Sequence, residues 1–599
     1  MKFCLVLIGF CLVTCTGLGQ DSSRIQQKAK KLAKDVYEDW LLVKHPSDDT
    51  SFMQKSQQQY EAFAGRVIRH TEIHKLAFGE NVMDTNSYVG SKINRVANRL
   101  QTGTKSYILR QFLFVKPGQA LDPFQVADNE RLLRQLDFIK DARIEVVPVG
   151  KDSVDLLVKV RDVFSIGVKA TASGISDLAT TLYDANLFGW AQRLELTLRY
   201  DHDRSPHMGT GFLYRKYNIA GTFVNAGISY STINTGLLPG DEYENTILLN
   251  IDRPLYTPNA KWAGGLQVGK SASVNRTNKP DSVYHAYGYT LNDIWLGYNF
   301  GTRVTRFRSR YEADSRKRRF LAFRYFDQHF SEKPLLPYYS YRFAEKQFLL
   351  GSFTWYQQNY YRTNYIYGFG RTEDLPVGSS QKLVMGLTRT DSLRRFYAGW
   401  EFNHWVVLPR DHYFVYTVAL GTNYNKQGFT DNSLLAAVNW ISPLIGLKDT
   451  RLRQYASVSY AGISNYRVYD QLYLDNDYGL GRFRTDSVFG TQRLSAGMET
   501  VVFTKWKLLG FKFGFFAFAK GSLLAQQEEP LFHGTWYSAL GGGFRTRNEN
   551  LIFGTIEGRF TYYPRTYGWL NNYSITFTSN LRLRFNEAQV QGPWFATIR

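Results

Sequence analysis

The feature that most limits how this chain can fold is a strict alternation of apolar and polar residues in segments far apart in the sequence. In QRLELTLRYD, Leu194, Leu196 and Leu198 alternate with charged or hydroxyl residues. In YSITFTSNLRLRF, which begins at Tyr573, apolar residues again occupy every second position except that of Ser579. Successive side chains of a strand point to opposite faces, so each segment predicts a strand with one apolar and one polar face. Similar segments follow one another from about residue 166 to residue 585, which predicts a large antiparallel β-structure.

Composition favours a membrane barrel over a soluble β-protein. Forty Tyr, forty-two Phe and twelve Trp make up 16% of the chain, yet its mean hydropathy is −0.33. No uncharged apolar run after the N-terminus approaches the ~18 residues that a membrane helix needs. In a transmembrane β-barrel only alternate residues meet lipid, and aromatic side chains gather at both interfaces. A soluble secreted sandwich is the alternative, but it would bury the apolar faces between two sheets and would rarely combine so many aromatic residues with so many turns.

The first nineteen residues read as a secretory signal peptide. Lys2 precedes an apolar run, and the small residues Gly17 and Gly19 come just before Gln20. This pattern predicts cleavage after Gly19. A lipid-attachment signal ending at Cys15 is the alternative, although Thr14 is a poor residue before a lipidated cysteine.

Cysteine and charge content then exclude several classes of function. All three cysteines, Cys4, Cys11 and Cys15, lie in the predicted signal peptide. The mature chain therefore has no disulfide framework, thiol nucleophile or cysteine metal site. The formal charge of +21 would suggest nucleic acid, but the basic residues are dispersed and the chain is predicted to be exported. Anionic lipid headgroups around a basic barrel rim account better for this charge.

Between the signal peptide and the barrel, the pattern predicts a linker and a small α+β domain. Residues 20–64 are polar and partly helix-like. Within 65–164, RVIRHTEIHKLAF predicts a strand and LRQFLFVKPG a short helix. Asp122 and Pro123 then suit the N-cap and first position of a second helix. ARIEVVPV and SVDLLVKVRDVF predict two further strands, so the order is strand, helix, helix, strand, strand.

Short motifs in the chain do not indicate an enzyme. Residues 264–271, GGLQVGKS, satisfy the phosphate-loop pattern, but this chemistry needs a strand before the loop and a helix after it. The segment instead sits among predicted barrel strands. No Gly-x-Ser-x-Gly or His-Glu-x-x-His sequence occurs. Asp475 and Asp477 could begin a calcium loop, but Gly479 breaks the pattern. We therefore predict no catalytic residues, metal, cofactor or nucleotide.

Three stretches resemble a known family. FLFVKPGQALDPFQVADNERLLRQLDFIKDARIEVVPV is similar to a POTRA domain of outer-membrane assembly proteins, and one such domain is present. LYDANLFGWAQRLELTLRY resembles the turn that joins the first two barrel strands in the BamA/TamA family, here Asn186, Leu187, Phe188 and Gly189. GLGRFRTDSVFGTQRLSAGMETVVF resembles the sixth extracellular loop of that family and the strand after it, with five strand candidates following. The resemblance implies a barrel of sixteen strands over residues 165–585, where the residues alone suggest sixteen to nineteen.

The resemblance also implies an arginine lock inside the barrel. In the family an Arg-Gly-Phe or Arg-Gly-Tyr tip folds into the lumen and its arginine pairs with acidic residues on the inner wall. Here the order is Gly481, Arg482, Phe483, so the arginine is shifted by one residue. Glu499 and Glu557 face inward by strand parity and are its expected partners. A solvated surface arginine is the alternative.

Family members commonly end on an aromatic residue that closes the barrel, and Phe585 suits that role. Residues 586–599 follow it as a tail, which could enter the lumen, extend away from the barrel, or mean that the last strand lies elsewhere.

The implied function is insertion of β-barrel proteins into the outer membrane, or translocation of proteins across it, without nucleotide hydrolysis. The resemblance places the barrel in the outer membrane of a Gram-negative-type bacterium and the POTRA domain in the periplasm. Expected partners are unfolded client proteins, outer-membrane lipids and accessory lipoproteins, and neither nucleic acid nor nucleotide. A dedicated secretion transporter and a passive porin-like channel are the alternatives.

If the lock exists, Arg482→Ala removes a charge-assisted pair that holds the loop in the lumen. The expected result is a barrel that unfolds at lower temperature in a heat-modifiable gel-shift assay, together with impaired function. An unchanged gel shift and normal growth would show that Arg482 is a solvated surface residue.

Overall fold

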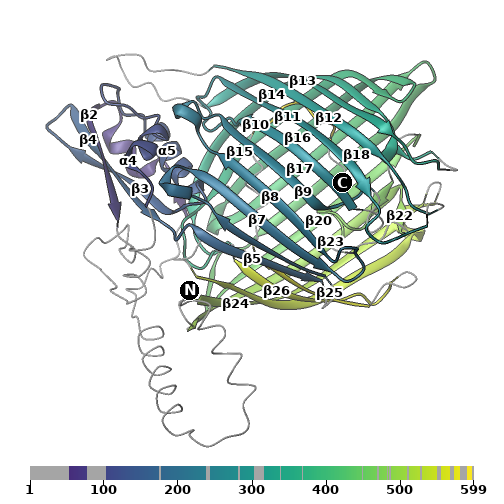
Figure 1. Cartoon of the computed structure of the whole chain (residues 1–599). Helices are drawn as coiled ribbons and strands as arrows, with labels where there is room; N and C mark the ends of the chain where they lie inside the picture. The colour runs from purple at the N-terminus through teal and green to yellow at the C-terminus, as the bar shows by residue number, and fades with distance from the viewer. Residues whose placement is uncertain are drawn as a thin grey trace, which may run out of the picture.

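The computed structural model describes residues 53–76, 103–173, 177–237, 243–280, 283–301, 316–336, 339–366, 368–447, 450–467, 471–481, 483, 488–508, 511–526, 529–548, 555–566, 572–579 and 590–596. The predicted signal peptide and most of the predicted linker lie outside these residues. The described chain is mostly β, with a large antiparallel barrel and a small α+β domain at one of its ends (Figure 1). Among these residues, no helix is both long and apolar enough to cross a membrane.

The small domain, described over 53–76 and 103–162, is a three-stranded sheet packed against two helices. Its elements are η1 (Gln58–Phe63), β2 (Val67–Leu76), α4 (Ser106–Gln111), α5 (Pro123–Gln135), β3 (Ile139–Pro148) and β4 (Ser153–Asp162). The predicted N-cap is present, because the Asp122 side chain accepts a hydrogen bond from the Phe124 N–H and Pro123 opens α5. In the sheet, β4 lies between β2, which is parallel to it, and β3, which is antiparallel. The buried core includes Ile68, Leu109, Val126, Leu133 and Val158.

The barrel is a ring of twenty strands in the part of the chain that the structure describes. They are β5 (Ile166–Ser173), β6 (Asp177–Asp184), β7 (Gln192–Asp201), β8 (Met208–Lys216), β9 (Asn225–Thr235), β10 (Tyr243–Arg253), β11 (Trp262–Val274), β12 (Gly288–Phe300), β13 (Lys317–Glu332), β14 (Lys346–Thr363), β15 (Glu373–Thr390), β16 (Leu393–Leu408), β17 (His412–Asn425), β18 (Gly428–Ile441), β20 (Thr450–Ser464), β23 (Gln492–Leu508), β24 (Phe511–Ala525), β25 (Thr535–Arg547), β26 (Ile556–Tyr562) and β27 (Tyr573–Ser579). Short strands β1 (Gln54–Lys55) and β19 (Ile445–Leu447) add to the edges of β14 and β20.

The predicted number of sixteen strands is therefore wrong. That number came from the resemblance, whereas the residues alone suggested up to nineteen. Several strands have few large apolar residues, such as β5 with IGVKATAS and β25 with its run of three glycines, so alternation is a weak signal there. The predicted number of five strands after the long loop is confirmed, since β23, β24, β25, β26 and β27 follow it.

The two faces of the strands have the predicted character. On β7, Leu196 and Leu198 are about half exposed on the outside while Arg193 is buried on the inside. On β27, Ile575 and Phe577 are likewise exposed. An apolar outer face and a polar inner face are typical of a β-barrel surrounded by lipid. The phosphate-loop match at 264–271 lies within strand β11 (Trp262–Val274), so the loop and helix that would hold a phosphate are not formed there.

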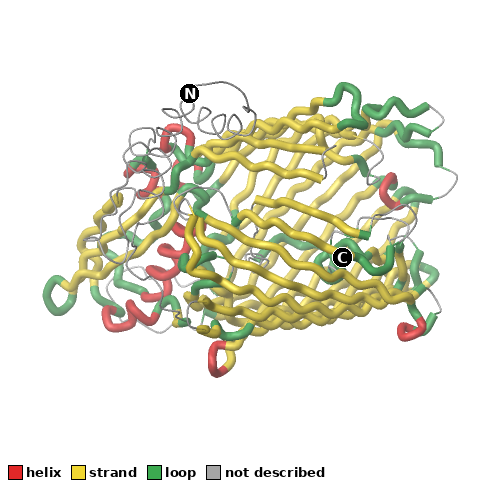
Figure 2. Tube along the Cα trace, turned by 90° about the horizontal axis from the view of Figure 1, so that it is seen from below, coloured by secondary structure: helices red, strands yellow, loops and turns green. Residues whose placement is uncertain are grey.

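Consecutive hairpins give the barrel two distinct ends. We call the end beside the small domain the near mouth and the opposite end the far mouth. Turns such as 185–191, between β6 and β7, lie at the near mouth, and the long connection between β20 and β23 belongs to the far mouth. In Figure 2 the helices of the small domain gather at one end of the tilted strands.

The ring has a seam where its first and last strands meet. Strands β5 and β6 pair along eight residues, and β26 and β27 along seven. Between β27 and β5 the described residues form a single partner pair, Phe577 and Ala172. Every other neighbouring pair in the ring is joined by a longer ladder, so this seam has the fewest backbone pairs in the part of the barrel that the structure describes.

Candidate functional site

Helix α5 of the small domain carries a buried carboxylate that joins the domain to the barrel. Glu130 accepts hydrogen bonds from the Tyr60 hydroxyl and from the Ile144 N–H, the latter at 2.9 Å. It also forms ion pairs with Arg134 in its own helix and with Arg362 of β14. All these groups are buried, and a buried carboxylate needs such a set of donors to remain charged. Glu130 thus ties the domain core to the inner wall at the near mouth.

Arg134 extends this network to the next strand. Its Nη2 lies 2.7 and 2.9 Å from the two carboxylate oxygens of Asp374 in β15, and its Nε lies 3.1 Å from one of them. Such a two-pronged pair is both strong and geometrically specific. Arg371, in the turn before β15, donates to the Arg134 carbonyl at 2.8 Å. Arg131 lies with its guanidinium 3.9 Å from the ring centre of Tyr360.

A second acidic residue on α5 binds the strands that precede β14. Asp128 pairs with Arg316, at 3.0 Å, at the start of β13. It also accepts a hydrogen bond from the Thr257 hydroxyl in the turn between β10 and β11. Glu130 and Arg134 are four residues apart and share one face of α5, whereas Asp128 shares another face with Arg131, three residues along. We call these four charged residues of α5 and their barrel partners the α5 network.

Burial and the neighbouring positive charges shift the pKa of the Glu130 carboxyl in opposite directions. Burial alone would raise the pKa of its carboxyl, but the neighbouring guanidinium groups of Arg362 and Arg134 lower that pKa from 4.5 to about 2. A lowered carboxyl pKa stabilises the folded state above the unfolded-state pKa, and this stabilisation is lost as the pH falls toward the folded-state pKa. The α5 network is therefore expected to persist at neutral and mildly acidic pH and to weaken between about pH 4.5 and 2.

The turn at 186–189 binds the small domain on the other side of the near mouth. Asn186 donates to the Thr104 hydroxyl at 2.8 Å, and the Lys105 N–H donates to the Gly189 carbonyl at 3.0 Å. Gly189 has a φ of +72°, and a side chain there would lie 2.5 Å from the Gly103 carbonyl oxygen. Glycine is needed for both reasons.

The other two predicted residues of this turn are Leu187 and Phe188. Phe188 is 59% exposed and packs edge-on against Trp190, and Leu187 opens the short helical turn at 187–189. The turn joins β6 and β7, the second and third strands of the ring. The prediction that it joins the first two strands is wrong, because β5 precedes β6.

The contacts between the small domain and the barrel follow half of the barrel rim. Asp137 pairs with Arg193 of β7 at 2.7 Å, and Asn218, in the turn between β8 and β9, donates to the Gln111 carbonyl at 2.9 Å. Together with the α5 network they extend from the β6–β7 turn to the start of β15. The domain therefore covers the part of the near mouth that begins next to the seam.

The connection between β20 and β23, which we call the far-mouth loop, enters the lumen. The side chain of Phe483 is buried and packs edge-on against Tyr537 and Tyr563, with ring centres 5.7 and 5.3 Å apart. Leu474 and Leu480 lie in the same cluster, together with the inward residues Val501, Phe503, Phe516 and Phe518. Gly481 has a φ of +64°, a conformation that glycine adopts without strain.

The predicted wall partners of the loop belong to an arginine cluster. Glu499 and Glu557 both face the lumen, as predicted. Arg545 lies 2.6 Å from Glu499 and 2.9 Å from Glu557, and Arg559 lies 3.3 and 2.8 Å from the same two carboxylates. Arg482 lies outside the described residues, so its pairing with either glutamate remains a prediction. Phe585, the predicted closing aromatic, also lies outside them.

Part of the predicted tail lies inside the barrel. Residues 590–596, which we call the lumen segment, pack along the inner wall from β12 to β17. This agrees with the first of the three fates predicted for the tail.

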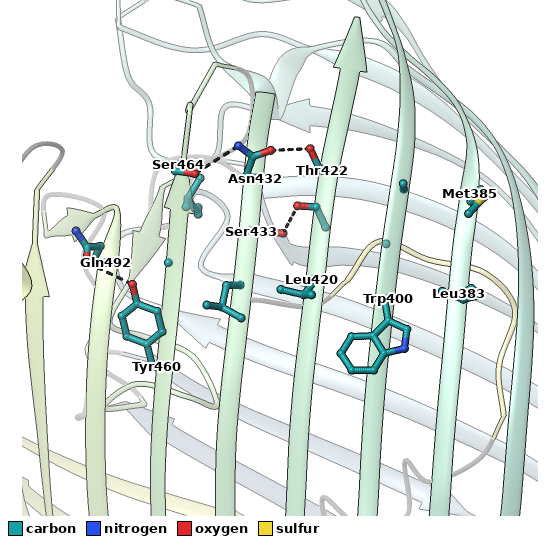
Figure 3. A pocket seen from close by; sticks show the side chains of 16 residues that line it. Leu383, Met385, Trp400, Leu420, Thr422, Asn432, Ser433, Tyr460, Ser464 and Gln492 are labelled. Atoms are coloured by element: carbon teal, nitrogen blue, oxygen red, sulfur yellow. Dashed lines mark hydrogen bonds between the residues drawn. The ribbon is translucent and has the colours of Figure 1, made fainter. Parts of the chain in front are cut away.

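A shallow groove of about 580 Å³ lies on the outer face between β15 and β23 (Figure 3). Its walls include Met385, Trp400, Leu420 and Tyr460, and small residues such as Ala398 and Gly462 form its floor. Toward the far mouth, Asn432 accepts a hydrogen bond from Thr422 at 2.6 Å and donates one to Ser464 at 3.4 Å. The groove is part of the outward surface rather than of the lumen.

Comparisons with known proteins give structural neighbours only. No protein-family model matches the chain, and no curated protein matches it. BamA from Haemophilus ducreyi lacking POTRA domains 1–3 is 12% identical over 86% of this chain and 85% of that chain, with a TM-score of 0.36. CdiB from Acinetobacter baumannii is 10% identical over 94% and 88%, with a TM-score of 0.39. CdiB from Escherichia coli is 9% identical over 92% and 82%, with a TM-score of 0.41.

Sequence reasoning missed the α5 network. The apolar spacing predicts the helix itself, but the charged residues of this helix make most of its contacts with the barrel. A signal was present, because Asp128, Glu130, Arg131 and Arg134 crowd one helix that a free domain would expose to water. Their partners could not be inferred, since Arg134 and Asp374 are 240 residues apart.

Asp374→Ala is expected to loosen the small domain from the barrel. The substitution leaves the buried Arg134 without its carboxylate partner, and removing one member of a buried ion pair costs about 3–5 kcal/mol. Spin labels on cysteines at Lys151 and Lys261, in the mature chain without residues 1–19, would report domain docking by double electron–electron resonance. A broadened distance distribution is expected for the variant, and for the unsubstituted chain only once the pH falls below about 4.5.

Asp327→Ala is the matched control, because Asp327 accepts a hydrogen bond from Gln347 on β14 at an exposed site farther along β13. Its distance distribution should remain narrow. Equal broadening in both variants, or none in Asp374→Ala, would show that the α5 network does not hold the domain.

Proposed function

We propose that this chain is an outer-membrane protein that inserts β-barrel proteins into the outer membrane, or translocates proteins across it, without nucleotide hydrolysis. The observation that carries the proposal is the seam between β5 and β27, with one partner pair among the described residues. Strands in lipid need partners for their backbone groups. A seam that opens can therefore offer an edge on which a client strand pairs, a feature that other sheets avoid.

The small domain lies where a client would arrive. We propose that it is a POTRA domain in the periplasm, since it has the order strand, helix, helix, strand, strand and its contacts begin next to the seam. Strand β3 is at the edge of its sheet in the described residues, and an edge strand can bind an extended polypeptide by strand addition. A client held there would be close to the barrel before it pairs.

A membrane location is supported by the exposed apolar outer face and by the predicted signal peptide. On opposite sides of the ring, Leu198, Tyr325, Met498 and Phe560 are among the exposed outer residues. We propose that outer-membrane lipids cover this belt, and that unfolded client proteins and accessory lipoproteins are the protein partners.

Protein handling is favoured over a passive porin by what occupies the lumen. The small domain covers half of the near mouth, the loop with Phe483 packs inside the barrel, and the lumen segment lies along the wall. A passive channel would not need these elements. We propose no enzymatic role, since the buried carboxylates of Asp128, Glu130 and Glu557 are each paired with arginine.

Depletion of the protein tests the proposal most directly. If its clients are barrel proteins, quantitative proteomics of outer membranes should show a fall in many of them, while inner-membrane proteins stay constant. Loss of one exported protein with normal barrel levels would instead identify a dedicated secretion transporter. Unchanged levels of all exported and barrel proteins would contradict the proposal.

Locking the seam should stop function reversibly. Ala172→Cys combined with Phe577→Cys places two thiols at the one partner pair, and oxidation would hold β5 and β27 together. We expect barrel insertion in reconstituted vesicles to fall at least tenfold on oxidation and to recover with reductant. The matched control, Ala170→Cys with Thr180→Cys, joins β5 to β6 within one hairpin and should not inhibit. Full activity of the oxidised seam variant would mean that the seam does not open.

A further inference from the structure

The lumen segment, residues 590–596, occupies a continuous site on the inner barrel wall. Val590 packs against a cluster that contains Leu255, Ala263 and Phe320. Gly592 lies against Trp295, so closely that a side chain at this position would be 2.6 Å from the indole ring. The segment thus begins its path on β12 and β13 with a tight glycine contact.

Two aromatic residues anchor the middle of the segment. The Trp594 ring lies with its centre 4.3 Å from the Arg324 guanidinium and meets Phe326 edge-on at 5.5 Å. Phe595 meets Phe348 and Tyr397 edge-on, each with ring centres 4.7 Å apart. Perpendicular ring pairs and a cation over an indole face are favourable arrangements.

Backbone groups of the segment also bind the wall. The Pro593 carbonyl accepts a hydrogen bond from Arg324 at 3.3 Å, and the Ala596 N–H donates to the Tyr397 hydroxyl at 2.7 Å. Both are contacts to side chains, and residues 590–596 form no strand in the barrel sheet. The segment therefore rests on the wall and does not belong to the ring.

The wall keeps its charged groups paired without the segment. The Arg324 Nε lies 2.7 Å from an Asp293 carboxylate oxygen, and its Nη2 pairs with the other oxygen. Removal of the segment would leave Arg324 paired with Asp293, so this charge would keep its partner. Trp594 is also 37% exposed in place. Both observations favour a segment that can leave the wall.

We propose that this wall, from Trp295 to Tyr397, is a binding site for extended client segments with neighbouring aromatic residues, and that the lumen segment is a built-in competitor that occupies it at rest. The inference rests on the proposed function, because it requires clients that reach the lumen. A client segment with two adjacent aromatic residues can make the ring contacts of Trp594 and Phe595, and the arginine can stack on its first aromatic ring. The lumen segment then leaves the wall when a client segment enters the lumen and takes its place.

Peptide binding to the full chain in detergent tests this inference. The probe is a fluorescent peptide with the sequence of residues 590–599, measured by anisotropy. Trp594→Ala with Phe595→Ala weakens the internal competitor and leaves the wall intact, so the variant should bind the probe at least tenfold more tightly than the unsubstituted chain. A control peptide with alanine at both aromatic positions should bind neither.

A second variant expels the segment by another route. Gly592→Val places a side chain against Trp295 and keeps both aromatic residues, and it should raise probe affinity in the same way. A heat-modifiable gel shift identifies the folded variants. If either folded variant binds the probe no better than the unsubstituted chain, the segment is a permanent part of the barrel and the inference is wrong. Since the assay contains no client, it can succeed even if depletion disproves the proposed function, and it can fail while that function holds.

Discussion

The structure depends on one constraint, which is that each backbone polar group of a strand in lipid needs a partner within the protein. Twenty strands meet this constraint by forming a ring, with ladders of up to eighteen partner pairs, as between β14 and β15. Among the described residues the shortest ladder joins β5 and β27, which form one partner pair. An unpaired strand edge is a feature that closed barrels otherwise avoid. The small domain, the far-mouth loop and the lumen segment all bind the barrel interior or rim.

Buried charge stabilises the attachment of the small domain to the rim. Positive and negative groups alternate across the two structural units, in the order Arg362, Glu130, Arg134 and Asp374. Each carboxylate accepts from more than one donor atom. Apolar contacts alone would bind such surfaces with little regard to orientation. Ion pairs with defined geometry fix the orientation of the domain relative to the rim. They need not bind it more tightly than a well-packed apolar interface would.

The sequence predicts the faces of strands better than their number or partners. Leu196 and Arg193 could be assigned to opposite faces of β7 because the period of a strand is two residues. The elements of the small domain could likewise be predicted, including the Asp122 cap, because those signals are local. The turn at Asn186 comes one hairpin later than the resemblance implies, because β5 and β6 form a hairpin before it. Pairs such as Arg134 with Asp374, or Trp594 with Arg324, depend on contacts between distant parts of the chain, and no local pattern encodes them.

The position of the domain contacts around the ring has a mechanical consequence. The small domain is bound near the first strands through Asn186, in the turn between the second and third strands, and to the tenth strand, β14, through Arg362. Strand β1 also pairs with β14. A rigid unit attached along one half of a rim resists bending of that half. Distortion of the barrel is therefore directed into the other half of the wall, from β16 to β27, whose last strand forms the seam.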